Sequence, residues 1–165
     1  MQLEKLVEAY SRHPRCRALA KQLDEANCKT IYAEGLQGSA ASLVVASLSH
    51  GSEKERRRPM LVIMNDEEEA GYFYHDLVQI GGDADVLFFP SPYRRAVKYA
   101  QRDAGNEILR TEAMSRLASK ASAPIVVTYP DALAVKVATE AHLTSQTVDV
   151  KCGDSIKVSE LGRRL

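Results

Sequence analysis

Three short apolar runs constrain the fold of this chain more than any other feature. A continuous apolar run of this length is typical of a strand that is buried on both faces of a sheet. Segments with helical patterns separate the runs, and strands that alternate with helices require crossover connections and a parallel sheet. The sequence therefore predicts an α/β fold, a three-layer parallel sheet with helices on both faces. The runs occupy residues 60–64, 86–89 and 125–128.

Local signals place the helices between and before these strands. A predicted helix runs from Asp66 to Ile80, because acidic residues in its first turn favour the positive end of the helix dipole and Gly81-Gly82 ends it. Pro14 is well placed in the first turn of an earlier helix. The other expected elements are a first helix with Leu3, Leu6, Val7 and Tyr10 on one face, a strand at about 29–34, and helices at 39–48, at about 104–120 and from Pro130.

The pattern changes after His142. Residues 147–152 alternate apolar and polar side chains, as a half-exposed antiparallel strand does, and an apolar helix stripe follows a Gly153-Asp154 turn. The sequence stops on that stripe, so we expect a second small module that begins near residue 144 and is cut short. The predicted organisation is N-terminal helices at 1–27, an α/β domain at 28–143 and the opening strand and helix of a truncated module at 144–165.

Charge and cysteine usage exclude several functional classes. The 22 basic residues balance 22 acidic ones, so no bulk positive field attracts nucleic acid, and DNA contact would need a local patch. Neither the three cysteines nor the four histidines have partners at metal-ligand, redox or catalytic spacing. No segment approaches the roughly 18 apolar residues of a membrane span. We therefore expect a monomeric, cytoplasmic chain that binds no metal and no membrane and carries no catalytic residue.

Residues 35–42 read G-L-Q-G-S-A-A-S, at a point where a strand is expected to lead into a helix. Nucleotide-binding proteins hold phosphate at this position with the pattern G-x-x-x-x-G-K-[ST]. Here Ala40 and Ala41 replace the second glycine and the lysine, so no ammonium group neutralises the β/γ-phosphate charge. We interpret the segment as a strand-to-helix turn without hydrolysis, with weak anion or nucleotide binding as the alternative. The residues of this degenerate phosphate loop are Gly35, Gly38, Ser39 and Ser42.

Two charged segments offer rival sites. Asn65 and the acids at 66–69 follow a strand and resemble a magnesium-binding box, although a dipole-favourable helix start explains them. A basic and aromatic loop leaves the carboxyl edge of the sheet, where open α/β folds bind ligands. Its arginines could hold phosphates and its tyrosines could stack on bases; the alternative is a solvated loop. This loop contains Tyr93, Arg94, Arg95, Lys98, Tyr99 and Arg102.

Four segments occur in a characteristic order: E-G-L-Q-G-S-A-A-S-L, R-P-M-L-V-I-M-N-D-E-E-E-A, V-L-F-F-P-S-P-Y and A-P-I-V-V-T-Y-P-D-A-L. Together they resemble the amino-terminal region of bacterial transcription-repair coupling factors, which is itself similar to the excision-repair helicase subunit UvrB. The resemblance covers roughly residues 28–165 and excludes the two N-terminal helices. No single motif is highly specific, so the order and spacing of the segments carry the resemblance.

The resemblance implies a helicase-like module that has lost its chemistry. In UvrB the equivalent loop is an intact phosphate loop, whereas in coupling factors it is a degenerate copy, and ATP and Mg²⁺ belong to a separate motor. UvrB inserts a damage-probing hairpin where this chain has only the basic loop at 91–102. The module after the sheet docks the damage-recognition protein UvrA, and residues 144–165 are similar to its opening. Its main docking residues are expected beyond Leu165, with Arg163 and Arg164 as the nearest basic candidates.

The function implied by the resemblance is recruitment. The chain would help bring UvrA to a stalled RNA polymerase and would restrain the motor through contacts between domains, without a cofactor of its own. RNA polymerase and DNA would bind other domains of the parent protein. Two alternatives are a P-loop nucleotide-binding or ATPase domain, and a direct DNA-binding domain that uses Arg94, Arg95 and Lys98.

Overall fold

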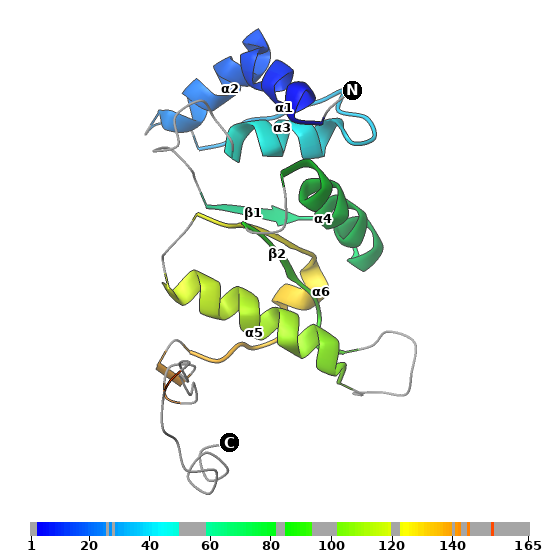
Figure 1. Cartoon of the computed structure of the whole chain (residues 1–165), viewed down its shortest axis with the longest axis vertical. Coiled ribbons are helices and arrows are strands. Elements are labelled where there is room, and N and C mark those ends of the chain that lie inside the picture. The colour runs from blue at the N-terminus through cyan, green and yellow to red at the C-terminus, as the bar shows by residue number, and fades with distance from the viewer. Residues whose placement is uncertain are drawn as a thin grey trace, which may run out of the picture. The chain divides into compact units, whose positions relative to one another are not determined.

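The computed structural model describes residues 3–25, 27, 29–49, 59–81, 85–93, 102–119, 123–139, 141, 142, 145 and 153. The chain divides into two compact units, Met1–Val135 and Lys136–Leu165. All the labelled helices and strands lie in the first unit (Figure 1). In chain order they are α1 (Leu3–Arg12), α2 (Pro14–Asp24), α3 (Ala40–Ser49), β1 (Met60–Ile63), α4 (Glu67–Gly81), β2 (Val86–Phe89), α5 (Ala104–Ser119), β3 (Ile125–Thr128) and α6 (Pro130–Leu133).

The strands form a parallel sheet in the order β1-β3-β2. Val126 of β3 is level with Leu61 of β1 on one side and with Leu87 of β2 on the other. This arrangement confirms the α/β class and the parallel strands. The strand expected at 29–34 is not formed, because residues 29–37 have no regular secondary structure. The sheet of the described residues therefore has three strands instead of four.

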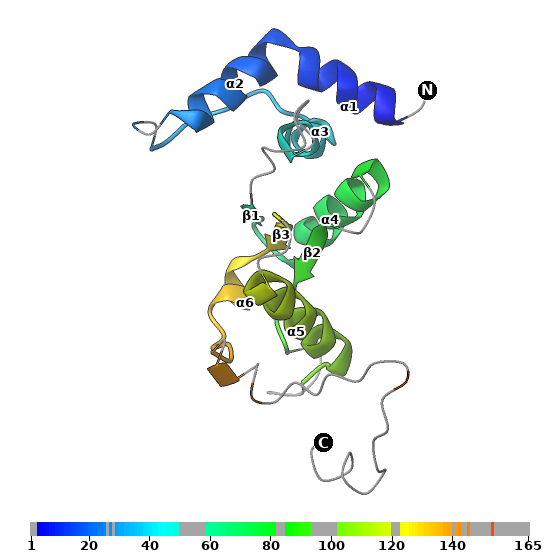
Figure 2. The ribbon, with the colours of Figure 1, turned by 60° about the vertical axis from the view of Figure 1, so that its left-hand side comes forward.

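The chain reverses its direction of travel across the sheet. The connection from β1 to β2 passes β3 through α4, and the connection from β2 returns through α5 to β3. Because crossovers between parallel strands are right-handed, opposite directions of travel place their helices on opposite faces. α4 and α5 accordingly lie on either side of the sheet in both views (Figures 1 and 2).

The core follows the central strand. All residues of β3 are buried, and those of β2 nearly so, which confirms the expectation for these two runs. The expectation is wrong for β1: Leu61 is 58% and Ile63 53% exposed, whereas Met60 and Val62 pack against the core. β2 is also an edge strand, but α5 packs against it and buries its second face. The main buried side chains come from α4, the strands β2 and β3 and the residue after β3: Ala70, Phe73, Leu77, Val86, Leu87, Phe89, Ile125, Val126, Val127 and Tyr129.

The helices before the sheet belong to the same compact unit. α3 packs against α1, α2 and α4, and Val7 of α1 and Ala46 of α3 reach the core cluster. His13 caps α2, because its Nδ1 accepts a hydrogen bond from the Arg15 backbone N–H at 3.3 Å and Pro14 follows at the first helical position. This confirms the helix that Pro14 was predicted to open.

The predicted boundaries at 27/28 and 143/144 stay predictions. Of the expected module at 144–165, only residues 145 and 153 are described, so its strand and helix lie outside the described residues. Within the described part of the chain, no helix combines the length and the apolar character that crossing a membrane requires.

Candidate functional site

The predicted phosphate loop is a glycine-dependent turn before α3. Gly35 and Gly38 have φ angles of +79° and +54°, in the left-handed region that favours glycine. A Cβ atom at either glycine would meet nothing within 4 Å. The glycines are therefore required by the turn of the backbone and not by the close approach of another group. Ser39 directly precedes α3, and its carbonyl accepts the Leu43 N–H at 3.0 Å.

The first turn of α3 is directed toward the protein interior. Ser42, at the position of the metal-binding hydroxyl, is only 2% exposed, and its Oγ donates to Asp76 Oδ2 of α4 at 3.2 Å. Ala41, at the position of the lysine, packs against the hydrophobic core. Gly35, Gly38 and Ser39 are exposed. The structure thus separates Ser42 from the other three loop residues and engages it in packing between two helices.

The acidic segment begins a helix, as the sequence predicts. α4 starts at Glu67, and Asp66 caps it, because Asp66 Oδ1 accepts the Glu69 backbone N–H at 2.9 Å. The Glu69 carboxylate in turn accepts a 2.7 Å bond from Asn65 Nδ2. Two carboxylates of the proposed magnesium box therefore have structural partners. Among the described residues, no three His, Cys, Asp or Glu side chains gather as metal ligands would.

The turn after β2 is fixed by side chains that sequence reasoning missed. The Ser91 N–H donates to Tyr129 Oη, and Asn106 Nδ2 donates to the Ser91 carbonyl, each at 2.8 Å. Thr128 Oγ1 donates to the Phe89 carbonyl at 2.8 Å. Tyr129 is 1% exposed, so these bonds satisfy polar groups that water does not reach. The carboxyl ends of β2 and β3 are thereby held together.

Arg110 of α5 is a buried cation at this edge of the sheet. Nη1 donates to the carbonyls of Pro90 at 2.7 Å and Ala132 at 3.1 Å, and Nη2 donates to Val135 at 3.4 Å. The guanidinium carbon lies 4.0 Å from the centre of the Phe89 ring, a cation–π contact. Burial lowers the pKa of Arg110, while Tyr129 and Tyr93 act to raise it. A guanidinium keeps its proton in proteins, so the carbonyls hold a permanent charge.

The basic loop leaves from a well-defined base. Tyr93 and Arg102 form an isolated antiparallel bridge, and the Asp103 N–H donates to the Pro92 carbonyl at 2.8 Å. Arg102 pairs with Glu107 at 2.9 Å. Asp103 Oδ1 accepts the Gly105 N–H at 2.9 Å at the start of α5. The residues of this region predicted to contact phosphate or a partner lie outside the described residues, as do those near the carboxyl terminus: Arg94, Arg95, Lys98, Arg163 and Arg164.

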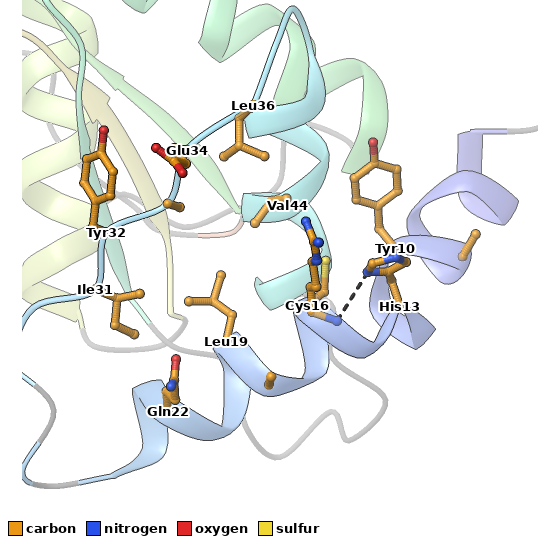
Figure 3. A pocket seen from close by; sticks show the side chains of 14 residues that line it. Tyr10, His13, Cys16, Leu19, Gln22, Ile31, Tyr32, Glu34, Leu36 and Val44 are labelled. Atoms are coloured by element: carbon orange, nitrogen blue, oxygen red, sulfur yellow. Dashed lines mark hydrogen bonds between the residues drawn. The ribbon is translucent and has the colours of Figure 1, made fainter.

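The structure also contains a pocket that the sequence did not indicate. It has a volume of about 680 Å³ and lies between α1, α2, the extended segment 31–36 and α3 (Figure 3). Its walls are largely apolar, and Leu19, Ile31 and Val44 contribute to three of them. Because each wall comes from a different part of the chain, no local pattern predicts this pocket.

Comparisons with known proteins do not assign the chain. No protein-family model matches it, and neither a curated protein nor a solved structure does. At the start of α3 the Ala40 N–H donates to the Gln37 carbonyl at 3.1 Å, and Ser42 is buried.

Proposed function

We propose that this chain is the UvrB-like module of a transcription-repair coupling factor and acts without catalysis. In that role it helps recruit UvrA to stalled RNA polymerase and restrains the ATP-driven motor of the parent protein by contacts between domains. The observation that carries the proposal is the position of Ser42, whose hydroxyl bonds to Asp76 instead of facing the loop. Together with the core packing of Ala41, it leaves the helix start without the side chains of a nucleotide site.

The proposed relationship extends to the fold. A parallel sheet whose strand order reverses, with a glycine turn before α3, is compatible with a reduced, three-layer member of the P-loop helicase-like folds. In this proposal ATP and Mg²⁺ belong to the motor, and RNA polymerase and DNA contact other domains of the parent protein. The module itself is a monomer in the cytoplasm and uses no cofactor.

Binding to purified bacterial UvrA tests the recruitment. With UvrA immobilised for biolayer interferometry, the chain should associate weakly but saturably, with a dissociation constant of about 10–100 μM. Reversing two charges with Arg163→Glu and Arg164→Glu should weaken the association about tenfold, because opposite charges at an interface steer and stabilise encounter.

The matched control is the same charge reversal elsewhere, Arg56→Glu with Arg57→Glu, which should leave the affinity unchanged. The proposed contact through Arg163 and Arg164 is wrong if the natural chain shows no saturable association, or if the two pairs of substitutions weaken it equally. The second result would indicate attraction by net charge instead of a docking site.

A further inference from the structure

The pocket between α1, α2, the extended segment 31–36 and α3 has the size and lining of a small-molecule site (Figure 3). Its volume is about 680 Å³, and pockets that hold small organic ligands have volumes of about 300–1,000 Å³ and mostly apolar walls. The interior is formed by side chains that are buried or half-buried: Cys16, Leu19, Ile31 and Val44. An apolar ligand in contact with them loses surface to water, which favours binding.

The interior suits an aliphatic body. Leu19, Ile31 and Val44 present branched aliphatic side chains from three different elements (Figure 3). The two tyrosines of the lining, Tyr10 and Tyr32, stand at opposite ends of the pocket, so they do not enclose a planar ring between them. A flexible chain adapts to such walls better than a rigid aromatic ring does.

One end of the pocket is positively charged. α2 begins there at Pro14, without an acidic residue in its first turn, and the start of a helix carries a partial positive charge. Arg15 lines this end with an exposed side chain, and no ion pair among the described residues involves it. His13 Nδ1 accepts the Arg15 N–H at 3.3 Å, so the neutral ring carries its proton on Nε2, where it is a donor.

The acidic residue of the lining is at the other end. Glu34 lies beside Tyr32, away from His13 and Tyr10 (Figure 3). The charges of the pocket are therefore separated along its length, with the cationic groups at the start of α2. A ligand with one negative group and an apolar body has a single favourable orientation in such a pocket, with the negative group at Arg15.

We propose that this pocket binds a carboxylate with an aliphatic tail, the chemistry of a medium-chain fatty acid. The carboxylate accepts hydrogen bonds from the Arg15 guanidinium, whose planar fork matches its two oxygens, and from His13 Nε2. The tail lies against Leu19 and Val44. This binding is independent of the proposed recruitment of UvrA.

Calorimetric titration of the chain with decanoate, below its micellar concentration, tests the proposal. We expect saturable binding with a dissociation constant of about 10–100 μM. 1-Decanol, which lacks the charge, should bind at least about tenfold more weakly, because charge-assisted hydrogen bonds are stronger than neutral ones.

Two pairs of variants locate the site. Arg15→Gln should weaken decanoate binding about tenfold, whereas Arg17→Gln should not change it, since Arg17 is exposed on the same helix and does not line the pocket. Leu19→Gln should also weaken binding about tenfold, because it places a polar group in the apolar interior. Its control is Leu23→Gln, because Leu23 is 46% exposed on α2 and lies outside the lining.

Cys16 reports occupancy without a change to the proposed contacts. It lines the pocket and is 9% exposed, and Cys28→Ser with Cys152→Ser leaves it as the single thiol. Decanoate at about ten times its dissociation constant should slow the alkylation of Cys16 by N-ethylmaleimide about tenfold, by mass action. The proposal would be overturned by the absence of saturable heat, by equal affinity for 1-decanol, by equal losses in the two arginine variants, or by alkylation at an unchanged rate.

Discussion

Replacing Arg110 with methionine is expected to lower the free energy of unfolding by about 3–5 kcal/mol. The buried carbonyls of Pro90 and Ala132 and the half-buried carbonyl of Val135 would lose their donor, and Phe89 would lose its cation–π contact. Methionine keeps much of the volume of the side chain, so the loss reports mainly the hydrogen bonds. Urea denaturation followed by circular dichroism measures the change.

Arg102→Met is the control for this change. Arg102 also pairs with a polar partner, Glu107, but its side chain is 68% exposed. An exposed ion pair contributes at most about 1 kcal/mol, so this variant should unfold close to the natural chain. Equal losses for the two variants would show that Arg110 does not hold the carboxyl edge of the sheet.

Leu77→Ala is expected to destabilise the chain by about 2–5 kcal/mol. Leu77 is 1% exposed on the face of α4 that packs against the sheet, so its removal takes apolar surface from the core and leaves a cavity. Tyr72 lies on the same helix but is 68% exposed, and Tyr72→Ala should change the stability by no more than about 0.5 kcal/mol. Thermal and urea unfolding of both variants measure the difference. The packing of α4 described above would be wrong if Tyr72→Ala had the larger effect.

The sequence predicts those elements whose signals are local. The acids after Asn65 and the glycines at 81–82 are within one turn of the ends of α4, and the structure places that helix at Glu67–Gly81. The apolar runs of β2 and β3 are found as predicted because their residues are buried regardless of which strands lie beside them. α3 begins within one residue of its predicted start, because its signal is also local: the glycine turn precedes it directly.

Features that depend on distant partners could not be predicted. The run at 60–64 is apolar throughout, but only one face of β1 meets the core, because α5 packs against β2 on the other side of the sheet. The segment at 29–34 has a strand-like composition, yet Ile31 contributes to a pocket wall beside α2 instead of a ladder. Both outcomes are decided by which elements meet in space, and neither segment contains that information.

In the candidate site, too, local features could be predicted from the sequence, whereas contacts between distant residues could not. The absence of the phosphate-binding lysine is visible at Ala41 in the sequence. The bond from Ser42 to Asp76 joins residues on two helices that are far apart in the chain. The role of Arg110 likewise depends on carbonyls from two different connections, so its position in α5 gave no signal.

Calorimetric titration with Mg-ATP tests the central claim, that this module has no nucleotide chemistry. The natural chain should give no saturable heat. The variant with Ala40→Gly and Ala41→Lys should also stay silent, because residue 41 packs against the core and the Ser42 hydroxyl is engaged by Asp76. Saturable binding of Mg-ATP by the natural chain at micromolar concentration, lost in Gly38→Ala, would contradict the account and make nucleotide binding the leading function.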